Sequence, residues 1–162
     1  MPPTKTTAPT AASAEAQITT ILSKFAAKDQ QLIRAVRKAL QKRFPTANEL
    51  VYDYARNFVI GYSPTQAGGQ GIAALSADAG GVRLYLTNGA SLPDPHKLLQ
   101  GKAQARYLPL GSAAVLLRPE VEALFVAAEK SAKVPLAASG RGEVIIKPGA
   151  AEKKPRKKAP QR

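Results

Sequence analysis

The sequence predicts an α+β fold in which an antiparallel sheet of four to five strands, built from two consecutive hairpins, is packed by two N-terminal helices and one C-terminal helix. Apolar residues recur at helical spacing in two stretches before residue 45 and in one after residue 118. Between these stretches, β-branched and aromatic residues alternate with polar ones at period two, which is typical of half-buried strands. The length of 162 residues fits one domain.

Composition divides the chain into three parts. Residues 1–13 are rich in Pro, Thr and Ala, and we expect this N-terminal segment to be disordered. Residues 14–133 carry the periodic patterns and form the predicted domain. Residues 134–162 are rich in Gly, Pro and Lys or Arg, which predicts a flexible basic tail in which only residues 144–146 have the composition of a brief strand.

The predicted helices have recognisable ends. Ser13 is a suitable N-cap for a first helix over residues 14–26, and Asp29 is a suitable N-cap for a second helix. Pro45 lacks a backbone N–H and disfavours helical angles at the preceding residue, so the second helix should end there. Pro119 suits the first turn of the third helix.

The strands of the sheet are predicted from alternation and turn residues. The first hairpin joins residues 50–54 and 58–62, and the second joins residues 72–77 and 82–87 through a turn at Asp78-Ala79-Gly80-Gly81. A fifth strand is predicted over residues 104–110, where Pro109 indicates a sheet edge or a strand end.

The formal net charge of +13 favours attraction to polyanions such as nucleic acids. Residues 141–162 contain eight Lys or Arg and two Glu, which gives +6 and leaves +7 for residues 1–140. The cations that suit phosphate contacts are Arg34, Arg37, Lys38 and Lys42 on the second helix and Lys153, Lys154, Arg156, Lys157 and Lys158 in the tail. The alternative is a solvated helix face and a tail that maintains solubility.

Several other classes of function are disfavoured. The longest apolar run has six residues, far short of the ~20 that cross a membrane, and no signal-peptide core follows the N-terminus, so we expect a soluble cytoplasmic protein. The chain has no cysteine, and its only histidine, His96, accompanies no Gly-x-Ser-x-Gly motif. Glu49 and Asp53 share one strand face and would suit acid-base work, but that face is interpreted as the solvated one. The sequence therefore favours a protein that is not an enzyme.

The aromatic residues of the strands allow two interpretations. They are Tyr52, Tyr54, Phe58, Tyr62 and Tyr85. They suit a platform on which nucleic-acid bases stack, and they equally suit the core of a sheet, which we favour because period-two aromatics are how such sheets pack.

A set of short motifs resembles one known family. The motifs are Glu49, Val51-Tyr52-Asp53, Phe58 to Thr65, Val82 to Leu86, Leu92-Pro93-Asp94-Pro95, Lys97-Leu98-Leu99, Gly101 and Arg106. Their order and spacing resemble the YdhG-like domains, small bacterial α+β domains of largely unknown function. The resemblance implies helices packed on an antiparallel sheet and implies no known catalytic set.

The resemblance also suggests where a ligand would bind. Because family-like residues gather there, we expect a small molecule or a protein to meet the surface of the first hairpin and of loop 92–101. The candidate residues are Tyr52, Asp53, Tyr54, Asn57, Tyr62, Lys97 and Arg106. Nothing in the sequence calls for a cofactor.

Some members of the family are described as frataxin-like intracellular iron chaperones, so iron binding is the alternative that the resemblance implies. Iron held for transfer needs carboxylate and imidazole ligands. The candidates are Glu49, Asp53, Asp94 and His96. The positive charge of the chain opposes the binding of a cation.

Overall fold

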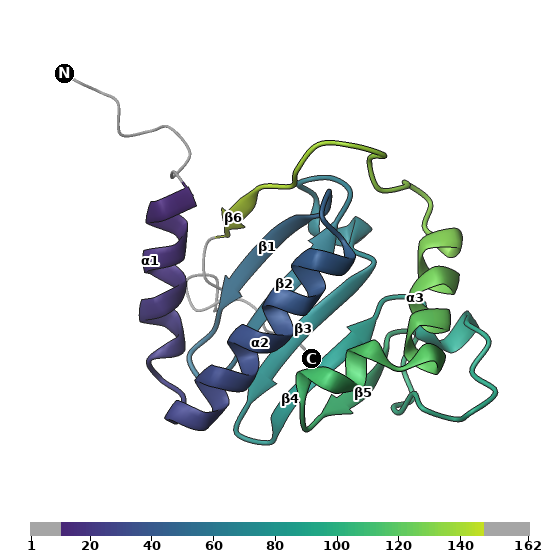
Figure 1. Ribbon diagram of the computed structural model, residues 1–162, viewed down its shortest axis with the longest axis horizontal. Coiled ribbons are helices and arrows are strands. Elements are labelled where there is room, and N and C mark those ends of the chain that lie inside the picture. The colour runs from purple at the N-terminus through teal and green to yellow at the C-terminus, as the bar shows by residue number, and fades with distance from the viewer. Residues whose placement is uncertain (1–10, 148–162) are drawn as a thin grey trace, which may run out of the picture.

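The computed structural model describes residues 11–147, in which helices cover one face of a single sheet (Figure 1). The helices are α1 (Ala11–Leu22), α2 (Ala27–Arg43) and α3 (Pro119–Ser131), with short 3-10 turns η2 (Gly68–Gln70), η3 (Gly89–Ser91) and η4 (Ala113–Leu117). The strands are β1 (Asn48–Asp53), β2 (Phe58–Ser63), β3 (Ala73–Asp78), β4 (Gly81–Leu86), β5 (Arg106–Leu110) and β6 (Val144–Ile146). The N-terminal segment 1–10 and the tail from residue 148 lie outside the described residues.

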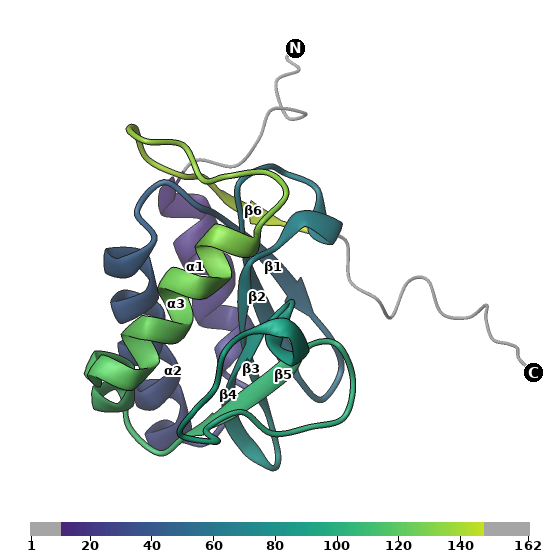
Figure 2. The same cartoon turned by 90° about the vertical axis from the view of Figure 1, so that its right-hand side faces the viewer.

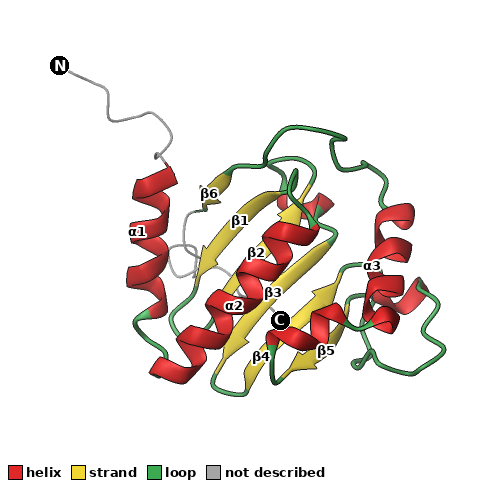
Figure 3. Ribbon diagram, in the orientation of Figure 1, coloured by secondary structure: helices red, strands yellow, loops and turns green. Residues whose placement is uncertain are grey.

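The sheet confirms the predicted α+β class and contains one strand more than expected. Its order is β5-β4-β3-β2-β1-β6, and neighbouring strands are antiparallel except for the parallel pair β1 and β6. Figure 3 shows α2 crossing in front of the central strands, with α1 and α3 on either side. No helix within residues 11–147 has the length and apolar character that crossing a membrane requires.

Strand β6 carries the fold beyond residue 133, where the sequence placed the end of the domain. Glu49 donates its backbone N–H to the carbonyl of Glu143 at 2.8 Å, and Lys147 donates to the carbonyl of Val51 at 2.9 Å. The segment 144–146, considered only as a brief strand, therefore completes one edge of the sheet. A strand of three residues is too short for its alternation to be recognised in the sequence. This strand is stabilised by its pairing with β1.

Two predicted helix caps are wrong. Helix α1 begins at Ala11, so Ser13 lies inside its first turn. Helix α2 begins after Ala26, which makes no side-chain cap, and Asp29 lies in the first turn, where its charge faces the positive end of the helix dipole. The predicted end is confirmed, since Phe44 donates its backbone N–H to Leu40 at 2.8 Å as the last turn closes.

The strand register separates two faces of the sheet. One row, Val51, Ile60, Leu75, Leu84 and Leu108, is buried under the helices. The next row, Tyr52, Val59, Ser76, Arg83 and Pro109, lies on the opposite face, which we call the open face. Figure 2 shows the helices gathered on one side of the sheet and the open face on the other.

This register corrects the interpretation of the aromatic residues and of the solvated face. Phe58 and Tyr62 belong to the core, as favoured, whereas Tyr52, Tyr54 and Tyr85 are half-buried and outside it. Glu49, expected on the solvated face, lies on the helix side and is 4% exposed.

Candidate functional site

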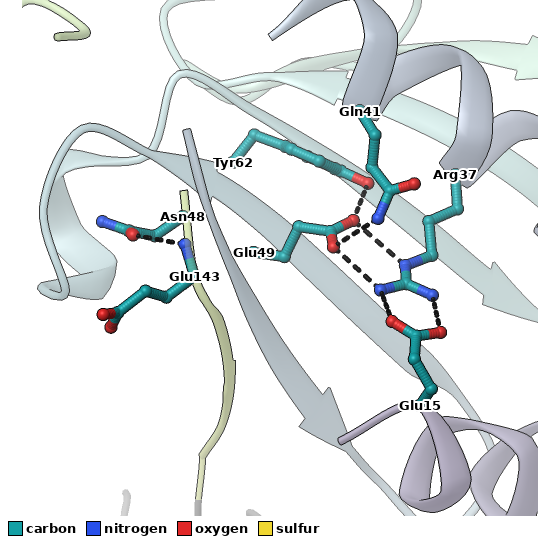
Figure 4. A network of polar contacts seen from close by, with 7 residues as sticks. All are labelled: Glu15, Arg37, Gln41, Asn48, Glu49, Tyr62 and Glu143. Atoms are coloured by element: carbon teal, nitrogen blue, oxygen red, sulfur yellow. Dashed lines mark hydrogen bonds and ion pairs between the residues drawn. The ribbon is translucent and has the colours of Figure 1, made fainter. Parts of the chain in front are cut away.

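A polar network joins the helix layer to the sheet where α1, α2, β1 and β2 meet (Figure 4). We call it the Arg37 network; it consists of Glu15, Arg37, Gln41, Glu49 and Tyr62. Arg37 and Gln41 are four residues apart on α2 and so project from one helix face. Glu49 and Tyr62 are directly opposite each other in the register of β1 and β2.

The Glu49 carboxylate accepts four hydrogen bonds. Its Oε1 accepts from Nη2 of Arg37 at 2.9 Å and from Nε2 of Gln41 at 2.9 Å. Its Oε2 accepts from Nε of Arg37 at 3.1 Å and from the hydroxyl of Tyr62 at 2.7 Å. A carboxylate offers about four acceptor positions, so every position of Glu49 is used. The network thus compensates for burying a charge at the edge of the core.

Glu15 completes the network from α1. Both of its oxygens accept from Arg37, each at 2.7 Å, which is the bidentate geometry that favours strong ion pairs. These hydrogen bonds, and the charge of Arg37, hold the pKa of Glu15 below its ordinary value. Burial lowers the pKa of Arg37, but the hydrogen bonds and charges of Glu15 and Glu49 outweigh burial and leave that pKa raised.

The Tyr62 hydroxyl is unsuited to proton transfer. Burial raises its pKa well above 10, and the neighbouring charge of Glu49 raises it further. A general acid or base works best with a pKa near the operating pH. At neutral pH the Tyr62 hydroxyl therefore keeps its proton and donates it in the hydrogen bond to Glu49.

A cavity of about 460 Å³ lies beside the network. Its lining consists of Glu15, Gln41, Phe44, Pro45, Ala47, Glu49 and Tyr62 from the first part of the chain and residues 141–146 from the segment that enters β6. At Gly142 a Cβ atom would lie 1.8 Å from the carbonyl oxygen of Ala47, so only glycine permits this close approach of the wall. Small-molecule sites have about this size and this mixture of apolar and polar lining.

The predicted ligand surface is not continuous in the structure. Tyr52, Asp53, Tyr54 and Asn57 lie where β1 turns into β2, whereas Arg106 begins β5 at the other edge of the sheet and Lys97 lies in the loop that precedes β5. Strands β3 and β4 separate the two groups. Tyr62 alone of the candidates belongs to the Arg37 network. Local motifs in the sequence could not reveal the strand order that separates these residues.

The four candidate metal ligands lie in different surroundings. All four acceptor positions of Glu49 are filled, and Asp53 pairs with Nζ of Lys24. Both oxygens of Asp94 accept backbone N–H groups of the following turn, from Leu98 and Leu99 at 2.9 Å each. His96 is exposed. Within residues 11–147 no group of three or more His, Cys, Asp or Glu side chains is placed to hold a metal ion.

The cations of α2 divide into two kinds. Arg34, Lys38 and Lys42 are exposed, so they stay available for phosphate contacts. Arg37 is 7% exposed and bound by two glutamates, which leaves its guanidinium little access to a phosphate. The five tail candidates from Lys153 to Lys158 lie outside the described residues.

Two members of the network, Glu15 and Gln41, were missed at the sequence level. One signal was present: Glu49 is two residues from Val51 and shares its strand face, and a carboxylate that is buried with an apolar residue needs a partner. The partner Arg37 is twelve residues away in the chain, and sequence spacing alone does not identify it.

Comparisons with protein-family models, with curated proteins and with solved structures find no match for this chain. Its function is therefore inferred from the geometry of the described residues.

Proposed function

We propose that the protein is a non-enzymatic binding module of the YdhG-like kind whose small ligand occupies the cavity beside the Arg37 network. The observation that carries the proposal is the cavity of about 460 Å³, whose lining combines the hydrogen-bonded pair Glu49 and Tyr62 with apolar residues such as Phe44. Preformed concave sites with few, fixed polar groups are the usual form of small-molecule sites.

The lining indicates the chemistry of the ligand. Its carboxylates are Glu15, Glu49 and Glu143, and Arg141 is the cation among the lining residues. Arg37 neutralises part of this negative charge. Because Glu49 has no acceptor position left, the acceptors that remain for a ligand are those of Glu143 and the second positions of the Glu15 oxygens. They favour a compact organic molecule with N–H donor groups and an apolar part that contacts Phe44.

The saturated bonding of the network supports a binding role over a catalytic one. A catalytic carboxylate must exchange a proton or approach a reacting atom. Glu49 has all its acceptor positions occupied, and the raised pKa of Tyr62 keeps its hydroxyl protonated at neutral pH. Both groups therefore support recognition through fixed geometry.

A thermal-shift screen of the full-length protein against amines, amino acids and nucleosides tests the proposal, because a ligand of the native state raises its stability. A true ligand should stabilise the wild type and lose most of its effect with Gln41→Ala, which removes a polar group from the cavity wall. The matched control is Gln31→Ala, an exposed glutamine on the same helix, which should leave the ligand-induced shift unchanged.

Three outcomes contradict the proposal. Equal ligand-induced shifts for Gln41→Ala and Gln31→Ala would place the ligand elsewhere. Stabilisation by ferrous or ferric iron that is lost on Asp94→Ala or His96→Ala would favour the iron chaperone instead. Turnover of any compound that binds would show that the protein is an enzyme.

A further inference from the structure

An apolar groove lies in the helix layer where α2, η4 and α3 meet. The turn η4 contacts both helices, and Figure 1 shows its short coil between them. The groove is a cavity of about 330 Å³, and its lining consists of Ala39, Leu40, Lys42, Arg43, Leu116, Leu117, Glu122 and Phe125. Most of these residues are apolar, and none of them lines the cavity beside the Arg37 network. The groove is therefore a second, separate site.

The groove follows from small side chains on one flank of α2. Ala39 lines it and is half-buried, and Ala35, one turn earlier on the same flank, is exposed. A methyl group is too short to fill the space between neighbouring helices, whose axes pack about 8–10 Å apart. The space beside Leu116 and Phe125 therefore stays open.

One wall of the groove is held in place by charged contacts. Arg43 pairs with Glu122 at 2.8 Å and with Glu129 at 2.9 Å. Its guanidinium carbon lies 5.6 Å from the ring centre of Phe125. These contacts join the end of α2 to α3, so the groove is formed before any partner binds. A preformed groove avoids the cost of ordering its walls on binding.

Two large apolar side chains beside the groove are exposed. Leu117 lines the groove and is 79% exposed, and Val126 of α3 is 39% exposed. Val126 lies four residues after Glu122 and three before Glu129, so it shares the helix face that Arg43 contacts. An apolar cavity that continues into exposed apolar side chains is typical of a surface that binds another protein.

Cations surround the groove without anionic partners of their own. Lys42 lines it, Lys38 lies one turn earlier on α2, and Arg118 directly follows Leu117. All three are exposed, and in the part of the chain that the structure describes none of them forms an ion pair. The charge of Arg43, by contrast, is offset by two glutamates. The groove thus combines an apolar surface with an excess of positive charge.

We propose that this groove binds an acidic amphipathic helix of a partner protein. The apolar face of that helix lies against Leu117 and Phe125. Its carboxylates lie opposite Lys38, Lys42 and Arg118. An apolar groove accepts such a helix through side chains that recur at i, i+3, i+4 and i+7. The cations at the rim select acidic partners and steer their approach.

Two other occupants fit these observations less well. A second copy of the chain would bring Lys42 and Arg118 of each copy toward the same cations, because a two-fold interface joins identical surfaces. An anionic membrane attracts cations, but it takes up a protruding apolar face, whereas most of this lining is recessed in a cavity. Both occupants are alternatives that the experiments distinguish.

The first probe is a displayed library of random peptides about 16 residues long, which span about 24 Å as a helix. Selection on the full-length wild type, with Leu117→Glu as the counter-selection, should enrich peptides that carry Asp and Glu and have apolar residues at helical spacing. The consensus peptide, synthesised with a fluorescent label, then gives affinities by anisotropy. A scrambled peptide of the same composition has no apolar face and should bind at least about tenfold more weakly.

Two substitutions at exposed positions test the groove without disturbing the core. Leu117→Glu should weaken binding of the consensus peptide by about tenfold or more, because it removes an apolar contact and repels the acidic peptide. Lys42→Glu should weaken binding by about fivefold and reduce its dependence on salt. The matched controls Ala55→Glu and Arg56→Glu, at exposed positions between β1 and β2, should bind as the wild type does. Circular dichroism checks that all four variants fold alike.

Glu122→Gln should change the affinity in the opposite direction. It removes the acid among the lining residues, so the consensus peptide should bind about threefold more tightly. A role of Glu122 in folding alone would not tighten binding.

Four results would each overturn the proposal. The first is a selection that enriches no acidic helical consensus. The second is equal affinity of the consensus peptide for Leu117→Glu and Ala55→Glu. The third is a wild-type dimer in analytical ultracentrifugation that Leu117→Glu dissociates, which would assign the groove to a second copy of the chain. The fourth is sedimentation of the wild type, but not of Leu117→Glu, with phosphatidylglycerol vesicles, which would assign the surface to a membrane.

Discussion

Two arginines of α2 each bind two glutamates, yet of the four pairs only Arg37 with Glu49 is buried on both sides, whereas the other three glutamates are 34–49% exposed. The Arg37 side chain is 9% exposed and its partner Glu49 5% exposed. The Arg43 side chain is 25% exposed, and its partner Glu122 48%. The hydrogen-bond lengths are nearly the same, since Arg37 meets Glu49 at 2.9 Å and Arg43 meets Glu122 at 2.8 Å. The two clusters thus differ mainly in solvent exposure.

The Arg43 cluster connects two helices. Arg43 binds Glu122 and, at 2.9 Å, Glu129 on α3, and its guanidinium carbon lies 5.0 Å from the ring centre of Phe44 and 5.6 Å from that of Phe125. Burial lowers the pKa of Arg43, but the hydrogen bonds of Glu129 and Glu122 outweigh it and the pKa is raised. Water reaches this cluster and screens its charges.

The comparison indicates that burial, rather than the number of ion pairs, decides how much each cluster contributes to the free energy of unfolding. Removing one partner of a buried pair leaves an uncompensated charge and costs about 3–5 kcal/mol, whereas an exposed pair contributes about 0–1 kcal/mol. The Arg37 network should therefore control both the stability of the fold and the shape of the adjoining cavity. The Arg43 cluster should affect only the packing of α3.

The largest expected effect is that of Arg37→Met. Glu49 would keep its buried charge without its main partner, so the free energy of unfolding should fall by about 3–5 kcal/mol, measured by urea denaturation. The double variant Arg37→Met with Glu49→Leu should recover only part of this loss, because it removes the buried charge but leaves the buried Tyr62 hydroxyl without its acceptor. Arg34→Met, at an exposed position of the same helix, is the control and should change stability by no more than about 0.5 kcal/mol. Equal losses for Arg37→Met and Arg34→Met would refute the assigned role of burial.

Tyr62→Phe should have an intermediate effect, because it leaves one acceptor position of Glu49 unfilled at a cost of about 1–3 kcal/mol. The wild type should also show a specific loss of stability at alkaline pH. The pKa of Tyr62 is raised in the folded state, so its contribution is fully present below pH 10, the ordinary value, and is lost as the pH rises above it.

Absorbance of tyrosinate recorded together with circular dichroism measures this titration. Tyr62 should ionise only as the protein unfolds, and the Tyr62→Phe variant should lack that step. The control Tyr85→Phe, on the open face, should retain it. Ionisation of Tyr62 in the folded protein near pH 10 would contradict the assignment.

Arg43→Met should have the smallest effect, about 1 kcal/mol or less, because its pairs are exposed and the Met side chain keeps apolar contact with Phe44 and Phe125. The loss should shrink at high salt, since screening weakens the pairs already in the wild type. A loss as large as that of Arg37→Met, or one that salt does not change, would show that the two clusters do not differ in the way their exposure indicates.

The order and type of the main elements were determined by the sequence itself. Pro45 ends α2, Pro119 begins α3, and period-two alternation marks β1 to β4. These signals are local: a missing N–H, a fixed φ angle or a repeat along one strand acts within a few residues. They sufficed for the α+β class and for the antiparallel pairing of consecutive strands.

The tertiary structure alone decided which residues form the candidate site. Periodicity shows that Glu49 and Val51 share a strand face, but only the packing of α2 makes that face the buried one. Likewise, Glu15 reaches Arg37, β6 pairs with β1, and loop 92–101 lies away from the first hairpin because of contacts between distant parts of the chain. Such contacts depend on the arrangement of all elements together, and no local pattern encodes them.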